Sequence, residues 1–420
     1  MNWTAEWNRR AFLKTAGLAS LLNTALPGSV GAAAARAARG ASNFFVPKVY
    51  RELGLRPFIN AAGTYTTLSA SLQPREVLAA MDEAGRAHVD IPELQAAVGK
   101  RIAGLLGCEA ALVTAGAAAA MTLGTAACVA GKDPKAIRQI PDLTGLKKTE
   151  VIIQKSHRYG YDHAIRNVGV KMVEVETREE LLAAAGEHTA MMLFFNANDP
   201  RGRIHAEEFV ALAKKLGVPT LNDAAADTPP PERLTMYTKM GFDLVAFSGG
   251  KGLRGPQCSG LLLGRKDLVE AAFLNGSPFS DSIGRGAKVG KEEIVGLLTA
   301  LELFLKRKQA AEWAEWERRV KYIADTVAKV PGVTAEREVP EIANQVPHLA
   351  IRWDPSKVRL TNRQVALELR EGNPRIELRP GSDHEVTPPL LHVGVWMMQP
   401  GEHVVLARRL REVLEKGARG

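Results

Sequence analysis

Between residues 151 and 247 the chain alternates short apolar runs with segments of helical periodicity. The apolar runs have the length of buried strands and cover residues 151–154, 170–175, 190–195, 219–221 and 243–247. Amphipathic segments lie between several of them, at residues 178–186 and 207–216 for example. Strands that alternate with helices form a mainly parallel sheet whose faces the helices cover. The sequence therefore predicts an α/β fold.

The length and the changes of pattern predict two folded domains. A chain of 420 residues, 46% of them hydrophobic, can bury a core larger than one domain usually holds. From about residue 332 the order becomes strand, strand, helix, strand, strand, helix, which is typical of a small α+β domain. We predict a large domain with its amino-terminal arm at residues 41–330 and a small carboxyl-terminal domain at residues 331–420.

The first forty residues resemble a twin-arginine export signal. The sequence NRRAFLK at residues 8–14 is followed by an apolar stretch at residues 15–26 and by an alanine-rich end at residues 30–38. The competing interpretation is an ordinary amphipathic helix that contains two arginines. We expect residues 1–40 to lie outside the fold, the export machinery to be a partner, and the protein to be periplasmic or otherwise exported.

Charge and cysteine content narrow the class of function. The net charge is +9, part of it in the first forty residues, and no dense basic run follows, so a nucleic-acid partner is not expected. Cys108, Cys128 and Cys258 form no CxxC or Cys/His pattern, so we expect no metal site. No later stretch is long and apolar enough to span a bilayer, and we expect no stable membrane insertion.

A glycine-rich turn carries the lysine on which the functional prediction depends. The apolar run at residues 243–247 ends in Ser248, Gly249 and Gly250, and Lys251 follows before a second apolar strand at residues 261–263. A lysine that a strand end delivers into a tight turn is well placed for covalent amine chemistry. We predict that Lys251 carries pyridoxal 5′-phosphate (PLP) as a Schiff base.

Residues after other strand ends are candidates for holding that cofactor, since ligands of parallel sheets bind beyond the carboxyl ends of strands. Asp223 follows the run at 219–221 and would keep the pyridine nitrogen protonated; the alternative is a helix cap. His157 could stack on the ring or transfer protons; Tyr161 competes with it, and a surface or capping role is the other possibility. The small residues that open a helix and could bind phosphate are Ala115, Gly116 and Ala117, although a tightly packed alanine-rich helix would look the same.

Taken together, these features resemble the fold-type I PLP enzymes, and among them the selenocysteine synthase-like group. That group includes L-seryl-tRNA(Sec) selenium transferase and D-glucosaminate-6-phosphate ammonia-lyase type proteins. The sequence SGGKGLRGPQ at residues 248–257 is similar to the group's S-G-x-K-x-x-G-G-P-Q segment, with Arg254 in place of a glycine. The sequences INAAG at 59–63 and TAGAA at 114–118 also match.

The resemblance implies a large domain with a seven-stranded type of sheet and assigns roles to single residues. It implies Lys251 as the Schiff-base lysine, Asp223 as the pyridine partner, and Ser248 with the Gly116 turn as the phosphate site. His157 stands where the related cysteine desulfurases place a ring-stacking histidine, and Arg375 would bind a substrate carboxylate. The group also implies a homo-oligomer with active sites shared between subunits.

The expected reaction begins with removal of an α-proton by Lys251. With a β-hydroxyl on a small amino acid or amino-sugar acid, α,β-elimination with release of ammonia follows, and without one, racemisation or transamination. Selenium transfer to seryl-tRNA fits less well, because an exported enzyme would meet no charged tRNA. A binding protein with this fold and no turnover is the non-enzymatic alternative.

Overall fold

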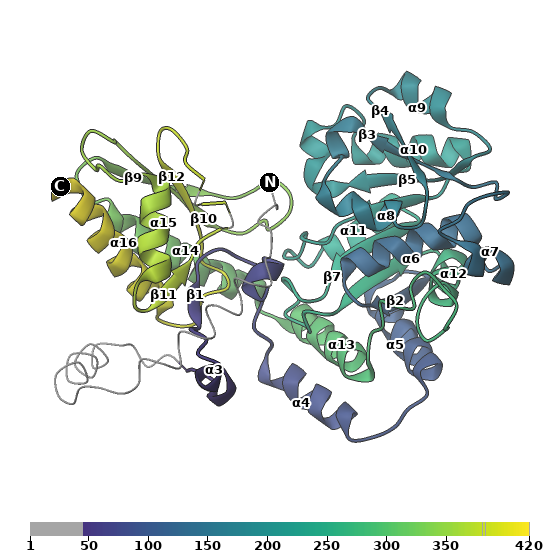
Figure 1. Ribbon diagram of the computed structural model, residues 1–420, viewed down its shortest axis with the longest axis horizontal. Helices are drawn as coiled ribbons and strands as arrows, with labels where there is room; N and C mark the ends of the chain where they lie inside the picture. Colours follow the sequence, from purple (N-terminus) through teal and green to yellow (C-terminus); the bar gives the residue numbers. More distant parts are fainter. Residues whose placement is uncertain (1–44, 380, 383, 420) are drawn as a thin grey trace, which may run out of the picture. The chain divides into compact units, whose positions relative to one another are not determined.

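The computed structural model describes residues 45–379, 381–382 and 384–419 (Figure 1). The predicted export signal at residues 1–40 lies outside these residues. The chain divides into one unit of residues 1–57 and a second of residues 58–420. In the described part of the first unit, helix α3 spans Lys48–Glu52. The second unit contains the sheets and the predicted site.

The second unit contains a seven-stranded sheet in the order β2-β8-β7-β6-β5-β3-β4. Strand β8 is antiparallel to both of its neighbours, and the strands from β7 to β4 are parallel to one another. The predicted α/β class with a mainly parallel sheet is therefore confirmed. The strands are β2 (Ala110–Thr114), β3 (Glu150–Gln154), β4 (Lys171–Val175), β5 (Thr189–Phe195), β6 (Thr220–Asp223), β7 (Leu244–Ser248) and β8 (Gly260–Gly264).

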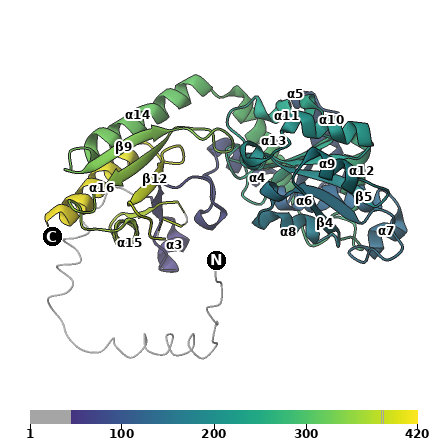
Figure 2. The ribbon, with the colours of Figure 1, turned by 90° about the horizontal axis from the view of Figure 1, so that it is seen from above.

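Helices cover both faces of this sheet because successive side chains of a buried strand point to opposite faces. Leu221 and Leu244 pack on one face, with side chains of α6 and α12, whereas Val245 and Phe247 pack on the other face. Figure 2 shows the two helical layers on either side of the sheet. The first face is covered by α6 (Ala117–Ala130), α8 (His163–Arg166) and α12 (Lys266–Leu274), and the second by α5 (Ile91–Leu106), α9 (Arg178–Ala184), α10 (Ala206–Leu216), α11 (Arg233–Met240) and α13 (Lys291–Lys306).

The periodicity of α13 illustrates what holds these layers together. Ile294, Leu297 and Leu301 recur at helical spacing and are fully buried. Each such side chain contributes about 1.5–3 kcal/mol to stability when it is removed from water.

The remaining described elements of the second unit before residue 309 are β1 (Phe58–Asn60), α4 (Arg75–Gly85), α7 (Pro134–Gln139) and the 3-10 turns η2 (Thr66–Leu68), η3 (Lys155–His157), η4 (Gly160–Asp162) and η5 (Asn196–Arg201).

The carboxyl-terminal region forms a second, smaller sheet. Strand β10 lies between β9 and β12 and is antiparallel to both. Helix α14 contacts β9 and α16, although all of its residues precede position 330. The domain boundary at 330 stays a prediction. The elements are α14 (Gln309–Val327), β9 (Val333–Glu338), β10 (His348–Trp353), α15 (Asn362–Glu371), β11 (Arg375–Glu377), β12 (Leu390–Gly394) and α16 (Glu402–Arg419).

A further strand pairing joins the start of the second unit to its carboxyl-terminal region. Strand β1 pairs in parallel with β11, so that Phe58 lies opposite Arg375 and Asn60 opposite Glu377. The sequence INAAG that begins at Ile59 is therefore held beside the carboxyl-terminal region. A backbone hydrogen bond extends this pairing beyond β1, since the Ala61 N–H donates to the Glu377 carbonyl oxygen at 2.9 Å.

Gly260 permits a close approach between β8 and the start of α6. A Cβ at this position would lie 2.4 Å from the Gly116 carbonyl carbon and 2.7 Å from the Ala117 nitrogen. We predict that Gly260→Ala lowers the free energy of unfolding by about 1–3 kcal/mol, since backbone atoms cannot move aside cheaply.

Gly104→Ala is the matched control for Gly260→Ala. Gly104 lies in α5 with open space around its Cβ position. Alanine is expected there to stabilise the protein by about 0.5–1 kcal/mol. Urea denaturation measures both variants, and an undiminished stability of Gly260→Ala would contradict the close approach.

Candidate cofactor and active site

The site lies at the carboxyl edge of the central sheet. Strands β2, β6 and β7 end there at Thr114, Asp223 and Ser248. Ser248 is paired across β7 and β8 with Gly260, and Gly260 is paired in turn with Thr114. The predicted phosphate residues follow Thr114 directly. The strand ends therefore gather Lys251, Asp223, Ser248 and the start of α6 at one edge.

The turn that carries Lys251 is fixed by backbone and side-chain hydrogen bonds. The Arg254 N–H donates to the Lys251 carbonyl oxygen at 3.0 Å. The Arg307 guanidinium donates to the carbonyl oxygens of Gly252 at 3.1 Å and Leu253 at 3.2 Å. The Ser71 hydroxyl donates to the Gly250 carbonyl oxygen at 2.7 Å. These hydrogen bonds hold the backbone of the Lys251 turn in one conformation.

Burial favours the neutral form of the Lys251 amine. The residue is half-buried, and removal from water lowers the pKa of Lys251, while the carboxylates of Asp223 and Asp227 act in the opposite direction. A neutral amine is the form that attacks a carbonyl carbon or accepts a proton. The surroundings of Lys251 thus suit the predicted covalent chemistry.

Asp223 is buried and held by two donors. Its Oδ1 accepts from the Ala225 N–H at 3.0 Å, and its Oδ2 accepts from the Tyr159 hydroxyl. Burial raises the pKa of Asp223, whereas the hydrogen bond from Tyr159 and the Lys251 charge lower it. Alternation along β6 places Asp223 on the same face as Leu221, which is the α6 face. A cation such as a protonated ring nitrogen would form an ion pair with the Asp223 carboxylate.

Tyr159 is a site residue that the sequence analysis missed. Its ring is stacked on Phe195, with centroids 3.8 Å apart and an interplanar angle of 7°, and its hydroxyl reaches Asp223. It lies between the two earlier candidates, His157 and Tyr161, just after the end of β3. The same strand-end rule covers it, but the sequence did not show which of the three side chains turns toward Asp223.

His157 is completely buried and engaged on both ring nitrogens. Its Nδ1 accepts from the Phe195 N–H at 3.2 Å, and its Nε2 lies 3.3 Å from the Gln154 amide nitrogen. The ring packs edge-on against Phe194, with centroids 4.6 Å apart. Burial lowers the pKa of His157 to about 4. Tyr161, in contrast, is 66% exposed. Cofactor contact by His157 stays a prediction.

The predicted phosphate residues form the start of a 14-residue helix. Helix α6 begins at Ala117 directly after Gly116, and Ala115, Gly116 and Ala117 are half-buried. The Thr114 hydroxyl donates to the Gly116 carbonyl oxygen at 2.9 Å, which fixes the turn. Free N–H groups at a helix start bind phosphate, and the small side chains leave room for it. The lysine, the buried acid and this helix start fit the parts of PLP.

Arg375 is paired within its own region of the fold. Its Nε donates to Glu377 Oε1 at 2.8 Å, and its guanidinium carbon lies 5.7 Å from the Phe58 ring centroid. Glu377 is buried and also accepts from Arg370 at 3.2 Å. The described contacts of Arg375 therefore lie around the β1–β11 pair. Substrate binding by Arg375 stays a prediction.

Arg254, which replaces a glycine of the family segment, adopts a left-handed backbone conformation with φ of 61°. That conformation costs a non-glycine residue about 1–2 kcal/mol. Its guanidinium donates to the Trp396 carbonyl oxygen at 3.3 Å and lies 4.0 Å from Glu312. The side chain thus ties the lysine turn to α14 and to the residues after β12.

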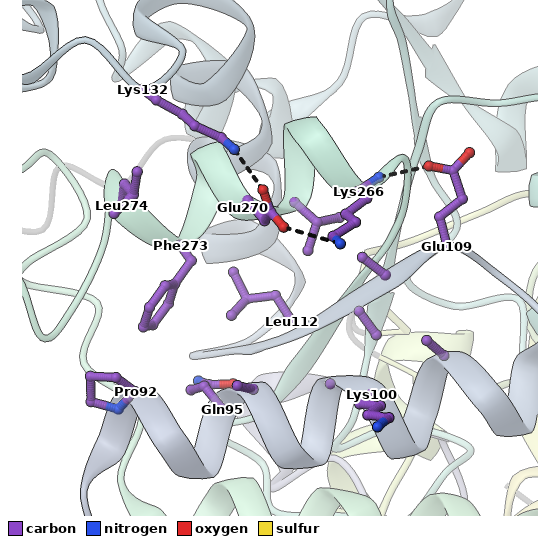
Figure 3. A pocket seen from close by; sticks show the side chains of 16 residues that line it. Pro92, Gln95, Lys100, Glu109, Leu112, Lys132, Lys266, Glu270, Phe273 and Leu274 are labelled. Atoms are coloured by element: carbon purple, nitrogen blue, oxygen red, sulfur yellow. Dashed lines mark hydrogen bonds and ion pairs between the residues drawn. The ribbon is translucent and has the colours of Figure 1, made fainter.

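A cavity of about 690 Å³ lies elsewhere, between α5, β2 and α12 (Figure 3). Apolar side chains such as Leu112 and Phe273 line it, and Lys132 is paired with Glu270 at 2.5 Å across its wall. Neither Lys251 nor Asp223 is among the residues that line it. This cavity is therefore separate from the candidate cofactor site.

Two further findings concern only the described residues. No group of three or more His, Cys, Asp and Glu side chains there is arranged to hold a metal ion. In the same part of the chain, no helix has the length and apolar character needed to cross a membrane.

Solved structures share this fold. D-glucosaminate-6-phosphate ammonia-lyase superposes with a TM-score of 0.77 at 29% identity and covers 89% of this chain and 100% of that chain. A structure described as SPT with PLP as an internal aldimine has a TM-score of 0.53 at 16% identity, with 86% of this chain and 88% of that chain covered. The fold is that of PLP-dependent enzymes.

Sequence comparisons give the family. The family described as SelA, L-seryl-tRNA selenium transferase, matches residues 56–328. A 5′-C-glycyluridine monooxygenase-decarboxylase from Streptomyces sp is 31% identical over 87% of this chain and 92% of its own length. D-glucosaminate-6-phosphate ammonia lyase from Salmonella typhimurium is 30% identical over 89% of this chain and 99% of its own length. The chain belongs to the SelA family of PLP-dependent lyases and transferases, and its cofactor is PLP.

The buried imidazole of His157 predicts a pH dependence of stability. Because the pKa of His157 falls from 6.5 to about 4 on folding, the unfolded chain binds a proton that the folded chain excludes between these values. The contribution of His157 to the free energy of unfolding is therefore fully present above pH 6.5. It decreases toward pH 4, by up to about 1.4 kcal/mol per pH unit. His157→Gln should remove most of that loss.

Urea denaturation between pH 4 and pH 7.5 measures this effect, with His188→Gln as the control because His188 is exposed. The control should retain the wild-type loss. A His157→Gln variant with an unchanged acid profile would show that the buried ring does not resist protonation.

Proposed function

We propose that the protein is a PLP-dependent lyase that releases ammonia from a hydroxyamino acid or an amino-sugar acid. The observation that carries the proposal is the convergence of the Lys251 turn, the buried Asp223 and the start of α6 at one edge of the sheet. The Salmonella relative, named an ammonia lyase, matches nearly its whole length to this chain and supports the reaction class.

Each part of the site has a role in this reaction. Lys251 would hold the cofactor through its amine, and the same amine would take the proton from the substrate α-carbon. Asp223 holds a proton on the pyridine nitrogen, and Tyr159 orients Asp223 through its hydroxyl. Ser248 and the N–H groups at the start of α6 hold the phosphate. When bound, PLP supplies an electron sink for the pair left by the departing proton.

The identity of the leaving group decides the product. After the α-proton is removed, a β-hydroxyl leaves as water and an enamine results. The enamine is released and becomes an imine, which water hydrolyses to ammonia and a keto acid. Without a leaving group, return of the proton to the α-carbon would give racemisation, and delivery of the proton to the cofactor instead would give transamination. Selenium transfer and an inactive binding protein remain alternatives that a substrate screen separates.

The expected result of that screen is release of ammonia together with a keto acid from D- or L-hydroxyamino acids or amino-sugar acids. The purified protein should absorb at about 410–430 nm, and borohydride should fix the cofactor to the peptide that contains Lys251. Lys251→Ala should lose both the band and the turnover, on the order of a thousandfold or more. Lys239→Ala, on α11, is the control and should keep both.

Other outcomes of the screen assign other functions. Exchange of the α-proton with solvent deuterium without ammonia release would favour a racemase. Consumption of oxygen would favour the chemistry named for the Streptomyces relative. A colourless protein, or one whose Lys251→Ala variant retains the cofactor equally well, would contradict the proposal.

We also propose that residues 1–40 direct twin-arginine export of the folded protein, which supports a periplasmic site of action and a small-molecule substrate. The NRRAFLK sequence at residues 8–14 is the basis. A reporter that is active only after twin-arginine export should be exported when fused behind residues 1–40. Replacement of Arg9 and Arg10 by lysine should reduce its export at least tenfold, and unchanged export would contradict the signal.

A homo-oligomer with shared active sites is part of this proposal. Light scattering of the purified protein tests the oligomeric state, since a mass of 45.4 kDa for the intact chain would correspond to a monomer and contradict the homo-oligomer.

A further inference from the structure

A second buried carboxylate, Asp227, lies close to the Lys251 turn. Asp227 is 3% exposed and belongs to the segment that follows β6. Its neighbour Thr228 packs directly on the neighbour of Lys251, since a Cβ on Gly252 would lie 2.0 Å from the Thr228 carbonyl oxygen. The negative charge of Asp227 opposes the effect of burial on Lys251. Two carboxylates, Asp223 and Asp227, therefore act on one lysine.

A buried network of hydrogen bonds orients Asp227. Its Oδ2 accepts from the Asn196 amide at 2.5 Å and from the Tyr237 hydroxyl at 2.5 Å. The Tyr237 oxygen in turn accepts from Arg233 at 3.2 Å, and Arg233 also donates to the Gln345 side chain at 3.3 Å. These bonds join η5, α11 and a loop of the carboxyl-terminal region to Asp227.

The charged and titratable groups that act on Asp227 come from several elements. Tyr237 and Arg233 lie on α11, Asp223 ends β6, and Lys251 lies in the turn after β7. Burial raises the pKa of Asp227 to about 6, and the Asp223 charge contributes to the increase. Above neutral pH the group is mostly ionised, so it presents a negative charge to Lys251.

Burying two carboxylates whose charges interact is costly. Each loses hydration, and the two repel one another. An asparagine at position 227 could accept hydrogen bonds from Asn196 and Tyr237 without that cost. Perturbed ionisable groups of this kind gather at functional sites. The charge itself, rather than its hydrogen bonds, is therefore what needs an explanation.

We propose that Asp227 is a positioning residue whose charge holds the proton on the Lys251 nitrogen. In the proposed function, Asp223 pairs with the protonated pyridine nitrogen of PLP, and its charge is then compensated. Of the two carboxylates, Asp227 is left to stabilise the positive charge that Lys251 acquires when it takes the substrate α-proton. The inference rests on the proposed role of Lys251 as the cofactor lysine.

The test is a pH titration of the absorbance of the cofactor-loaded protein at about 410–430 nm, which reports the proton on the lysine nitrogen. Asp227→Asn keeps the size of the side chain and removes its charge. Since a negative charge favours the protonated form, the midpoint should shift to lower pH by on the order of one unit. The acid limb of the kcat profile should shift in the same direction.

Asp243→Asn is the matched control. Asp243 precedes β7 at the end opposite to the Lys251 turn, and its carboxylate accepts from the Thr220 N–H at 2.8 Å. Its replacement should leave the titration midpoint unchanged. A midpoint for Asp227→Asn equal to that of the wild type, with only a lower melting temperature, would overturn the inference and make Asp227 a structural residue.

Tyr237→Phe is the second test variant, for use if Asp227→Asn does not fold. The change removes a donor to Asp227 and so raises the pKa of Asp227, which reduces its charge near pH 7. A smaller shift of the midpoint to lower pH is then expected, and no shift would overturn the inference. If the wild-type protein forms no band at about 410–430 nm, the proposed role of Lys251 fails, and this inference fails with it.

Discussion

The site depends on one electrostatic constraint, which is the placing of a lysine amine among buried carboxylates. Loss of hydration disfavours the charged amine, and nearby negative charges favour it. For Lys251 the two effects oppose each other, and burial is the larger. An amine in this balance gains or loses a proton at a modest cost. That property is what a base that must later return its proton requires.

The central sheet makes this balance possible because it fixes the positions of the charges. Asp223 ends a strand that is buried on both faces, and Lys251 follows the neighbouring strand in a turn braced by Arg307. The antiparallel β8 then returns past the start of α6, where Gly260 lets the two backbones meet. The sheet and the turn after β7 therefore fix the positions of these charges relative to one another.

Local pattern was enough to predict most of the strands, and it indicated the two main candidate site residues. Apolar run length and helical spacing located β3, β5, α9 and α10, and the positions after strand ends indicated Lys251 and Asp223 as candidates. Other features depend on contacts between distant segments. The pairing of β1 with β11, the Glu377 partner of Arg375 and the choice of Tyr159 over its neighbours as the partner of Asp223 arise only when the chain is folded.

Arg254 shows where this chain differs from the segment that defines its family. A glycine would adopt the left-handed conformation without cost, whereas arginine pays about 1–2 kcal/mol for it. The bond to the Trp396 carbonyl oxygen and the attraction to Glu312 offset part of that cost. Arg254 lies three residues after Lys251, so these two contacts join the lysine turn to α14 and to the segment after β12. A glycine at this position would leave the lysine turn without either contact.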